Sequence, residues 1–255
     1  MEVCYCYDGT YYGFLTCVFD SYLYKEPPLA FRIQDSPSTF WEERVVSTQT
    51  EKARRVSRAL SQKVAPRAQV LVRRGFLTCQ PEKEMMLFRF IQFCLQHGGQ
   101  ALRAMADPHI RPVLTAVQHL EHEAHLYTGF LRFSEQDGVL IGEIEPKNRV
   151  LPLIQAHFCG RLNTECFVIH DRTHHEALFH RPGRWALIPV EQFQVGRPGP
   201  EESRFRALWR TFYDTVAIEG RINPKLQRTN LPLHYRRMMT EFAPDSSALT
   251  PPPSP

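Results

Sequence analysis

The fold is decided by Thr128-Gly129-Phe130-Leu131-Arg132-Phe133 and Val139-Leu140-Ile141-Gly142-Glu143-Ile144-Glu145, two stretches rich in β-forming residues. The polar segment Ser134–Gly138 joins them and ends in Asp-Gly, the dipeptide typical of a tight hairpin turn. The spacing therefore predicts a β-hairpin over residues 128–145.

Helical and strand patterns alternate after this hairpin. Val150–Leu162 has helical spacing, with Pro152 tolerated because it falls in the first turn. Three more short strands are predicted, at Cys166–Ile169, Glu176–His180 and Trp185–Pro189. A hairpin followed by a helix and further strands indicates an α+β fold, with one antiparallel sheet and several helices packed on it.

Helices predominate upstream of the hairpin. Apolar spacing predicts four of them. The first carries the stripe Leu15, Val18, Phe19 and Tyr22 and follows the N-cap candidate Thr10. The next two are Gln49–Val64 and Glu82–His97, and the fourth carries the seam Val113, Val117, Leu120 and Ala124. Val3–Tyr7 and Glu43–Ser47 are predicted to be short strands. The first helix is expected to end at Pro27-Pro28, and Glu82–His97 at Gly98-Gly99.

The domain organisation follows from these elements. We expect residues 1–242 to form a single α+β domain. An alternative division has a helical N-terminal part, 1–105, and a sheet-containing part, 106–242. Residues 243–255 are rich in Pro and Ser and are predicted to be a disordered tail.

Composition favours a cytoplasmic protein without a membrane segment. The chain has 255 residues, of which 43% are hydrophobic and 23% charged, as in ordinary globular proteins. No run approaches the roughly 20 apolar residues that cross a bilayer. The seven cysteines include no Cys-x-x-Cys pair, which argues against a disulfide framework and points to a reducing cytoplasm.

A series of polar residues near element ends marks a candidate site. Packing alone would favour Leu, Val or Ile at such positions. We expect six side chains to line one concave site at the edge of the sheet: Glu121, His125, Arg132, His157, His170 and Asp171. An equally open interpretation is that these residues only cap and pin the sheet.

No cofactor is expected from these residues. His119, His122 and His125 resemble a metal comb, but on a helix their imidazoles fan over about 120° and cannot share one ion. The remaining His and Asp residues lack the spacing of a known metal site, and no Gly-rich phosphate loop is present. The sequence therefore predicts no bound metal and leaves open whether the protein is an enzyme.

The net charge of +4 is unevenly distributed. Residues 52–74 contain eight basic side chains and no acidic one. Basic stretches of this kind attract phosphate backbones, although a solvated helix face has the same composition. The residues predicted to contact nucleic acid are Lys52, Arg54, Arg55, Arg58, Arg73, Arg74 and Arg172.

An ordered set of short motifs extends over residues 5–242. It comprises Tyr7-Asp8-Gly9-Thr10, Gly13-Phe14-Leu15, Val18-Phe19, Glu123-Ala124-His125, Gly129-Phe130-Leu131-Arg132-Phe133, Glu145-Pro146, His157-Phe158, Arg161, Ile169-His170-Asp171-Arg172, Trp209, Phe212, Ile218, Arg221-Ile222-Asn223-Pro224, Leu231-Pro232, Tyr235 and Met239-Thr240-Glu241-Phe242. With this set the chain resembles a bacterial family of DNA metabolism or DNA repair proteins built on a domain of unknown function. Residues 26–80 match only loosely.

The resemblance implies a partnership more than a reaction. Members are typically encoded beside a radical S-adenosylmethionine (SAM) protein of DNA modification or repair, and related domains are joined to uracil-DNA-glycosylase-like domains. The resemblance assigns no role to the motif residues. We expect this chain to lack the glycosylase-like domain, and it has no Cys-x-x-x-Cys-x-x-Cys motif, so it is expected to be neither the glycosylase nor the radical enzyme.

These observations together lead to one functional expectation and two alternatives. We expect an accessory or processing protein of DNA repair or modification that associates with DNA and acts with a radical SAM partner. The first alternative is an enzyme acting on a nucleotide or damaged base, with His125, His157, His170 and Asp171 around the reaction centre. The second is a protein–protein adaptor whose basic faces only keep it soluble.

Overall fold

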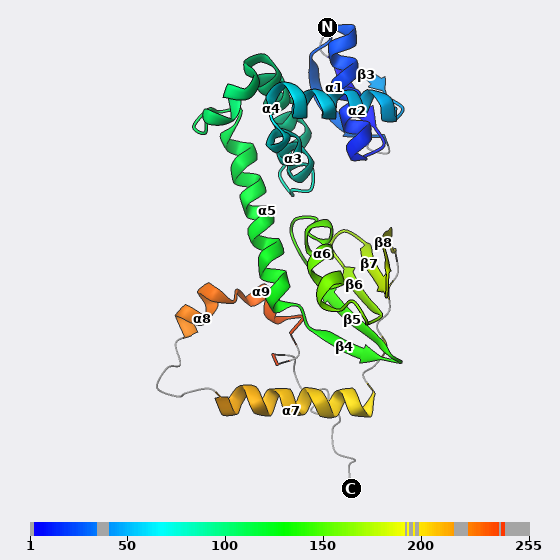
Figure 1. The fold of residues 1–255 in the computed structure, drawn as a ribbon, viewed down its shortest axis with the longest axis vertical. Coiled ribbons are helices and arrows are strands. Elements are labelled where there is room, and N and C mark those ends of the chain that lie inside the picture. Colours follow the sequence, from blue (N-terminus) through cyan, green and yellow to red (C-terminus); the bar gives the residue numbers. More distant parts are fainter. Residues whose placement is uncertain are drawn as a thin grey trace. The chain divides into compact units, whose positions relative to one another are not determined.

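The computed structural model describes residues 3–34, 41–191, 193, 196, 199–216, 224–239 and 241–242 (Figure 1). It contains helices and two sheets, which confirms the predicted α+β class. The chain divides into two compact units, Met1–His122 and Glu123–Pro255. The predicted tail, 243–255, lies outside the described residues. In the described part, no helix is both long and apolar enough to cross a membrane.

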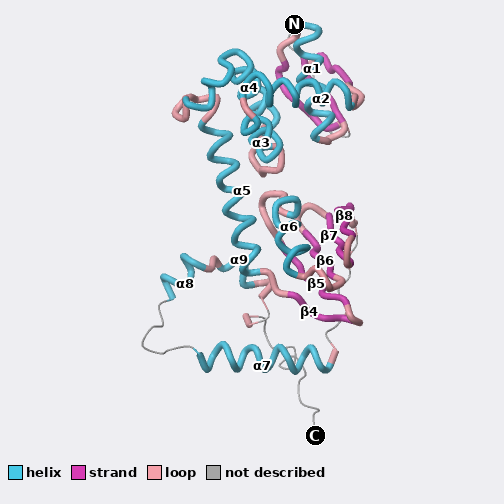
Figure 2. Tube along the Cα trace, in the orientation of Figure 1, coloured by secondary structure: helices cyan, strands magenta, loops and turns pink. Residues whose placement is uncertain are grey.

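The first unit combines a small sheet with a set of helices (Figure 2). Its elements are β1 (Val3–Tyr7), α1 (Tyr11–Tyr24), β2 (Pro28–Ile33), β3 (Glu42–Val45), α2 (Thr50–Ala59), the π-helix η1 (Leu60–Val64), α3 (Pro66–Gly75), α4 (Lys83–His97), the 3₁₀ helix η2 (Gly98–Arg103) and the first part of α5 (Arg111–Phe130). The strands are parallel, in the order β2-β1-β3. Every residue of the central strand β1 is buried, as expected of a parallel strand covered on both faces.

The sequence signals for most of these helices are confirmed. Thr10 caps α1 by accepting a hydrogen bond from the Gly13 amide at 2.9 Å. The helix predicted over Gln49–Val64 is present as α2 and η1. Helix α4 ends at Gly98, whose φ of +59° suits glycine. Strand β2 was not predicted, because Pro28 opens it and reads as a helix stop; proline is tolerated as the first residue of a strand.

The apolar stripe predicted for α1 is only partly inward. Leu15 and Val18 are fully buried. Phe19 is half-buried, and Tyr22 keeps 47% of its surface exposed. The outer half of this stripe therefore lies at the surface of the unit instead of in its core.

The second unit contains the sheet predicted from the hairpin. After the end of α5 it comprises β4 (Phe133–Gln136), β5 (Val139–Ile144), α6 (Leu151–Arg161), β6 (Phe167–Asp171), β7 (Glu176–Arg181), β8 (Arg184–Pro189), α7 (Pro200–Val216), α8 (Pro224–Asn230) and α9 (Leu233–Arg236). The strand order is β4-β5-β6-β7-β8. Three pairings are antiparallel, but β5 and β6 are parallel. The crossover helix α6 carries the chain back to the end of the sheet at which β5 begins (Figure 1).

The hairpin is shorter than predicted. Helix α5 continues to Phe130, so the first strand begins at Phe133 instead of Thr128. The turn is the dipeptide Asp137-Gly138, with φ of +50° and +77°. Both residues therefore have the positive φ that a two-residue type I′ turn requires.

Candidate functional site

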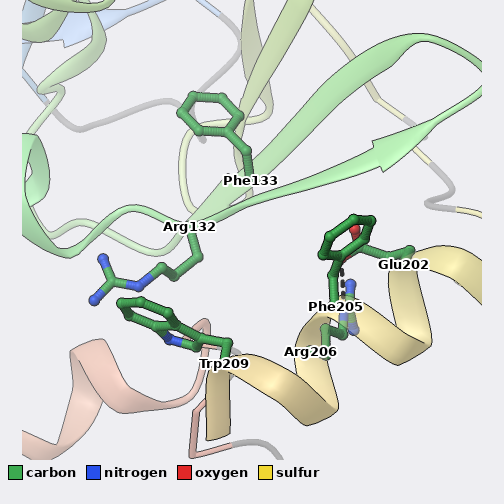
Figure 3. Close-up of a pocket in the computed structure, with 6 residues that line it drawn as sticks. All are labelled: Arg132, Phe133, Glu202, Phe205, Arg206 and Trp209. Carbon is green, nitrogen blue, oxygen red and sulfur yellow. Dashed lines mark hydrogen bonds and ion pairs between the residues drawn. The ribbon is translucent and has the colours of Figure 1, made fainter. Parts of the chain in front are cut away.

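A pocket of about 450 Å³ lies between β4 and α7 in the second unit (Figure 3). Its lining combines aromatic rings with two arginines and a carboxylate. The lining residues are Arg132, Phe133, Glu202, Phe205, Arg206 and Trp209. The α7 members have spacings of three and four residues, which place them on one side of that helix.

Polar contacts hold α7 against the edge strand β4. Glu202 accepts a hydrogen bond from the backbone amide of Glu135 at 3.3 Å. Arg206 pairs with Glu202 at 2.7 Å and donates a hydrogen bond to Ser134. A backbone group of an otherwise open sheet edge is thereby satisfied, and the pocket wall is tied to the sheet.

The aromatic rings of this pocket are unusually open. Phe205 is 67% exposed and Trp209 is 41% exposed. Trp209 stacks on Phe212 with ring centroids 5.7 Å apart. Phe133 also lines the pocket, but its ring points away from α7 (Figure 3) and packs edge-on against Phe158 of α6. Phe205 and Trp209 therefore present two large rings to solvent.

Arg132 provides the charged side of the pocket. Its guanidinium binds the buried carboxylate of Glu241 at 2.7 Å and lies beside the indole ring of Trp209 (Figure 3). Burial acts to raise the pKa of Glu241, but hydrogen bonds from Arg132, its own backbone amide and Trp209 outweigh burial and lower it. Glu241 therefore keeps its charge and fixes both Arg132 and Trp209.

The six predicted site residues lie in different environments. Arg132 is in this pocket. Glu121 belongs to the first unit, where it pairs with Arg74. His125 on α5 and His157 on α6 are exposed. Among the described residues, no hydrogen bond or ion pair joins any two of the six. That they line one concave site stays a prediction.

His170 and Asp171 lie together at the end of the buried strand β6. The Nδ1 atom of His170 is 3.6 Å from Glu143 Oε1, and its ring packs against Phe193. Asp171 is fully buried and accepts hydrogen bonds from the backbone amides of Thr173 and His174. Asp171 therefore shapes the turn between β6 and β7.

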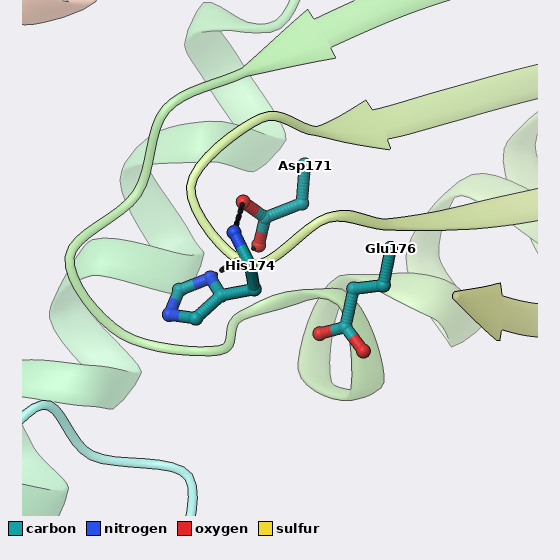
Figure 4. A group of neighbouring side chains, drawn as sticks. All are labelled: Asp171, His174 and Glu176. Atoms are coloured by element: carbon teal, nitrogen blue, oxygen red, sulfur yellow. Dashed lines mark hydrogen bonds and ion pairs between the residues drawn. The ribbon is translucent and has the colours of Figure 1, made fainter. Parts of the chain in front are cut away.

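Asp171, His174 and Glu176 form a cluster of side chains of the types that bind metals (Figure 4). One potential metal-ligating atom of each residue lies within 4.8 Å of those of the other two. Each of these groups already has a protein partner. The His174 imidazole is 2.7 Å from Asp171 Oδ2, and Glu176 binds the Arg149 guanidinium at 2.8 and 3.2 Å. The hydrogen bond to Glu176 raises the pKa of Arg149. The cluster is thus a network of hydrogen bonds and ion pairs, and a metal would have to displace these contacts.

Glu123 is a buried acid that the sequence reasoning did not select. Its carboxylate accepts hydrogen bonds from the backbone amides of Lys147 and Asn148 at 2.8 and 2.9 Å, and from the Asn148 side chain at 2.6 Å. It therefore fixes the segment between β5 and α6 to the last turns of α5. The available signal was its position in the Glu123-Ala124-His125 motif.

The predicted nucleic-acid contacts differ in how available they are. Three of the basic side chains from 52–74 pair with carboxylates outside that stretch: Lys52 with Asp20, Arg54 with Glu51 and Arg74 with Glu121. Arg172 similarly lies 3.4 Å from Glu145. Arg55 packs over the Phe19 ring at 4.9 Å. The stretch is therefore less strongly positive than its sequence indicates.

The other basic residues of this stretch form exposed surface. Arg58 and Arg73 are exposed, and in the described chain neither has an ion-pair partner. On α2, Ala53 and Val56 face the core, so Arg54, Arg55 and Arg58 project from the opposite side.

Comparison with known proteins gives a family and no reaction. Residues 81–241 match the family model described as domain of unknown function DUF4130. This match covers more than half of the chain, so the protein belongs to that family. No curated protein and no solved structure matches the chain. The matched region contains the whole β4–α7 pocket.

Proposed function

We propose that the protein is an accessory or processing protein of DNA repair or modification that binds DNA and holds an unpaired base in the β4–α7 pocket. One observation carries this proposal: Trp209 and Phe205 are open to solvent beside Arg132 and Arg206. An exposed aromatic ring is a platform for base stacking, and arginine donates to base edges and phosphates.

The charges in the pocket favour a base over a free phosphate. Arg132 and Arg206 are paired with Glu241 and Glu202, so the lining is nearly neutral. Each Arg–Glu pair offers both hydrogen-bond donors and acceptors. The edge of a base also presents both, so the two can complement each other. Stacking on Trp209 with hydrogen bonds at the rim is therefore the interaction that this pocket supports best.

The surface of α2 supports attraction to the DNA backbone. Arg54, Arg55 and Arg58 share its solvent face. Such a face binds phosphates without regard to sequence and weakens steeply as salt rises. Arg54→Ala combined with Arg58→Ala is expected to reduce affinity and the salt slope together. An unchanged salt titration would exclude this face of α2 as a DNA contact.

The experiment for the pocket is fluorescence anisotropy with labelled single-stranded and duplex oligonucleotides. Base stacking contributes roughly 1–3 kcal/mol, so Trp209→Ala is expected to weaken single-strand binding by about 5- to 150-fold. Trp185→Ala is the matched control, because Trp185 is also open, at 54%, but lies on the edge strand β8. Equal affinities for wild type and Trp209→Ala would reject the pocket as the base site.

The partner in this proposal comes from the family resemblance. We propose that the protein acts together with a radical SAM protein of DNA modification or repair. Co-elution of the two purified proteins in size-exclusion chromatography, with and without a single-stranded oligonucleotide, tests this. Separate elution under both conditions would leave a DNA-binding protein without that partner.

A further inference from the structure

A second pocket, of about 400 Å³, lies in the first unit beside the α2 surface proposed to attract DNA, with which it shares Arg55. It forms a groove between α1, the α2–η1 segment and α4. Its lining is mainly apolar, with Val18, Leu23, Val56 and Leu95 among its members. Leu23 is 55% exposed and Tyr22 is 47% exposed, so a large apolar strip faces solvent.

This strip explains why the stripe of α1 is only partly buried. An inward-facing stripe on a two-layer fold would end in the core. Here Phe19 and Tyr22 continue the stripe along the wall of the groove instead. The apolar spacing of α1 therefore serves two contacts, one with the core and one with a surface that is open in this chain.

The charge of the groove has one sign. Among the described residues that line it, the ionic ones are Arg55 and Lys63, both cationic and both exposed. The nearby carboxylate of Asp20 is neutralised by Lys52 at 2.7 Å. The groove thus complements a ligand with an apolar face and negative flanks.

The shape of the lining favours a peptide over nucleic acid. A base needs a flat aromatic platform, but the Phe19 ring already has Lys52 and Arg55 over it, at 5.7 and 4.9 Å. The remaining walls are mostly aliphatic, and grooves of this kind between helices accept leucine-type side chains of an amphipathic helix. We propose that this groove binds an acidic amphipathic helix of a protein partner.

The test uses a synthetic helical peptide and the full chain. The fluorescein-labelled peptide has about 16 residues, roughly 24 Å as a helix, with Leu at i, i+4, i+7 and i+11 and Glu on the flanks. Loss of an interface anchor costs about 1–2 kcal/mol, so Tyr22→Ala is expected to weaken binding about 5- to 30-fold. Tyr12→Ala is the matched control, because Tyr12 lies on the same helix, is 46% exposed and does not line the groove.

A charge reversal makes the test independent of folding defects. Lys63→Glu should lose the Glu-flanked peptide and gain a peptide of the same design with Lys flanks. Arg89→Glu, an exposed position on α4 outside the groove, should change neither peptide. The proposal is overturned if Tyr22→Ala and Lys63→Glu leave the Glu peptide unaffected. It is equally overturned if a single-stranded oligonucleotide displaces that peptide from wild type and Tyr22→Ala weakens the oligonucleotide more than the peptide.

Discussion

Replacing Glu123 by alanine should destabilise the second unit by several kcal/mol. The Glu123 carboxylate is buried and accepts three hydrogen bonds, two from backbone amides of Lys147 and Asn148 and one from the Asn148 side chain. A hydrogen bond to a charged group contributes about 1.5–3 kcal/mol, and a buried donor without an acceptor costs about 1–3 kcal/mol. Water entering the space of the lost side chain offsets part of this. We therefore expect a loss of about 3–5 kcal/mol.

Glutamine at this position separates charge from shape. Glu123→Gln retains one oxygen but points an NH₂ group toward donors, so a loss of about 1.5–3 kcal/mol is expected. The assay is urea denaturation at pH 7 followed by circular dichroism. The matched control is Glu121→Ala, two residues earlier on the same helix, where the side chain is 44% exposed and pairs with Arg74. Its effect should be within about 1 kcal/mol.

A loss of less than about 1 kcal/mol in Glu123→Ala, the range of an ordinary surface change, would contradict this prediction. An equal loss of stability in Glu121→Ala would contradict it as well. Either result would mean that the segment between β5 and α6 is not held by Glu123.

Three further predictions concern the pH response, the backbone and metal binding. The pKa of Glu241 is lowered, so its pairing with Arg132 stabilises the fold above the ordinary carboxyl pKa of about 4.3, and this contribution disappears as pH falls through the lowered value. The difference in unfolding free energy between wild type and Arg132→Met, measured in urea, should therefore be largest near pH 7 and shrink toward pH 3. A difference that does not change with pH would contradict this. Gly138→Val should cost about 1–2 kcal/mol, because Gly138 has φ of +77°, whereas Gly160→Ala inside α6 should stabilise the unit by about 0.5–1 kcal/mol; thermal unfolding of both variants checks the pair. After dialysis against Zn²⁺ and then buffer, elemental analysis should find far less than one zinc per chain, because Asp171 and Glu176 already have protein partners; stoichiometric zinc that is lost in His174→Ala would contradict this.

Much of the fold could be predicted because local signals were strong. The seam Val113, Val117, Leu120 and Ala124 is buried as its spacing indicates. The Asp-Gly turn and the helix 151–161, which buries one face, can also be predicted from a few neighbouring residues. The parallel β5–β6 pairing could not be predicted in this way, because the paired strands are distant in sequence. Strand β2 was missed because Pro28 resembles a signal for the end of a helix.

The candidate site was harder to predict for a related reason. Arg132 was selected from its place near the hairpin, but its partners Trp209 and Glu241 lie far along the chain. Spacing within one element cannot show such a meeting. The one local signal was α7 itself, where Phe205, Leu208 and Phe212 give an apolar surface that the structure leaves exposed. An exposed aromatic surface on a helix indicates binding, but only coordinates identify the arginines beside it.

The central claim is that the β4–α7 pocket holds an unpaired base, and 2-aminopurine fluorescence tests it most directly. The probe is placed either unpaired in a short duplex or opposite thymine in the same sequence. Stacking on Trp209 should quench the unpaired probe on binding of wild type and of Trp185→Ala, with little change for the paired probe. With Trp209→Ala the quenching should be lost while the basic surface still binds the duplex. Equal quenching by wild type and Trp209→Ala, or equal quenching of paired and unpaired probes, would contradict the account.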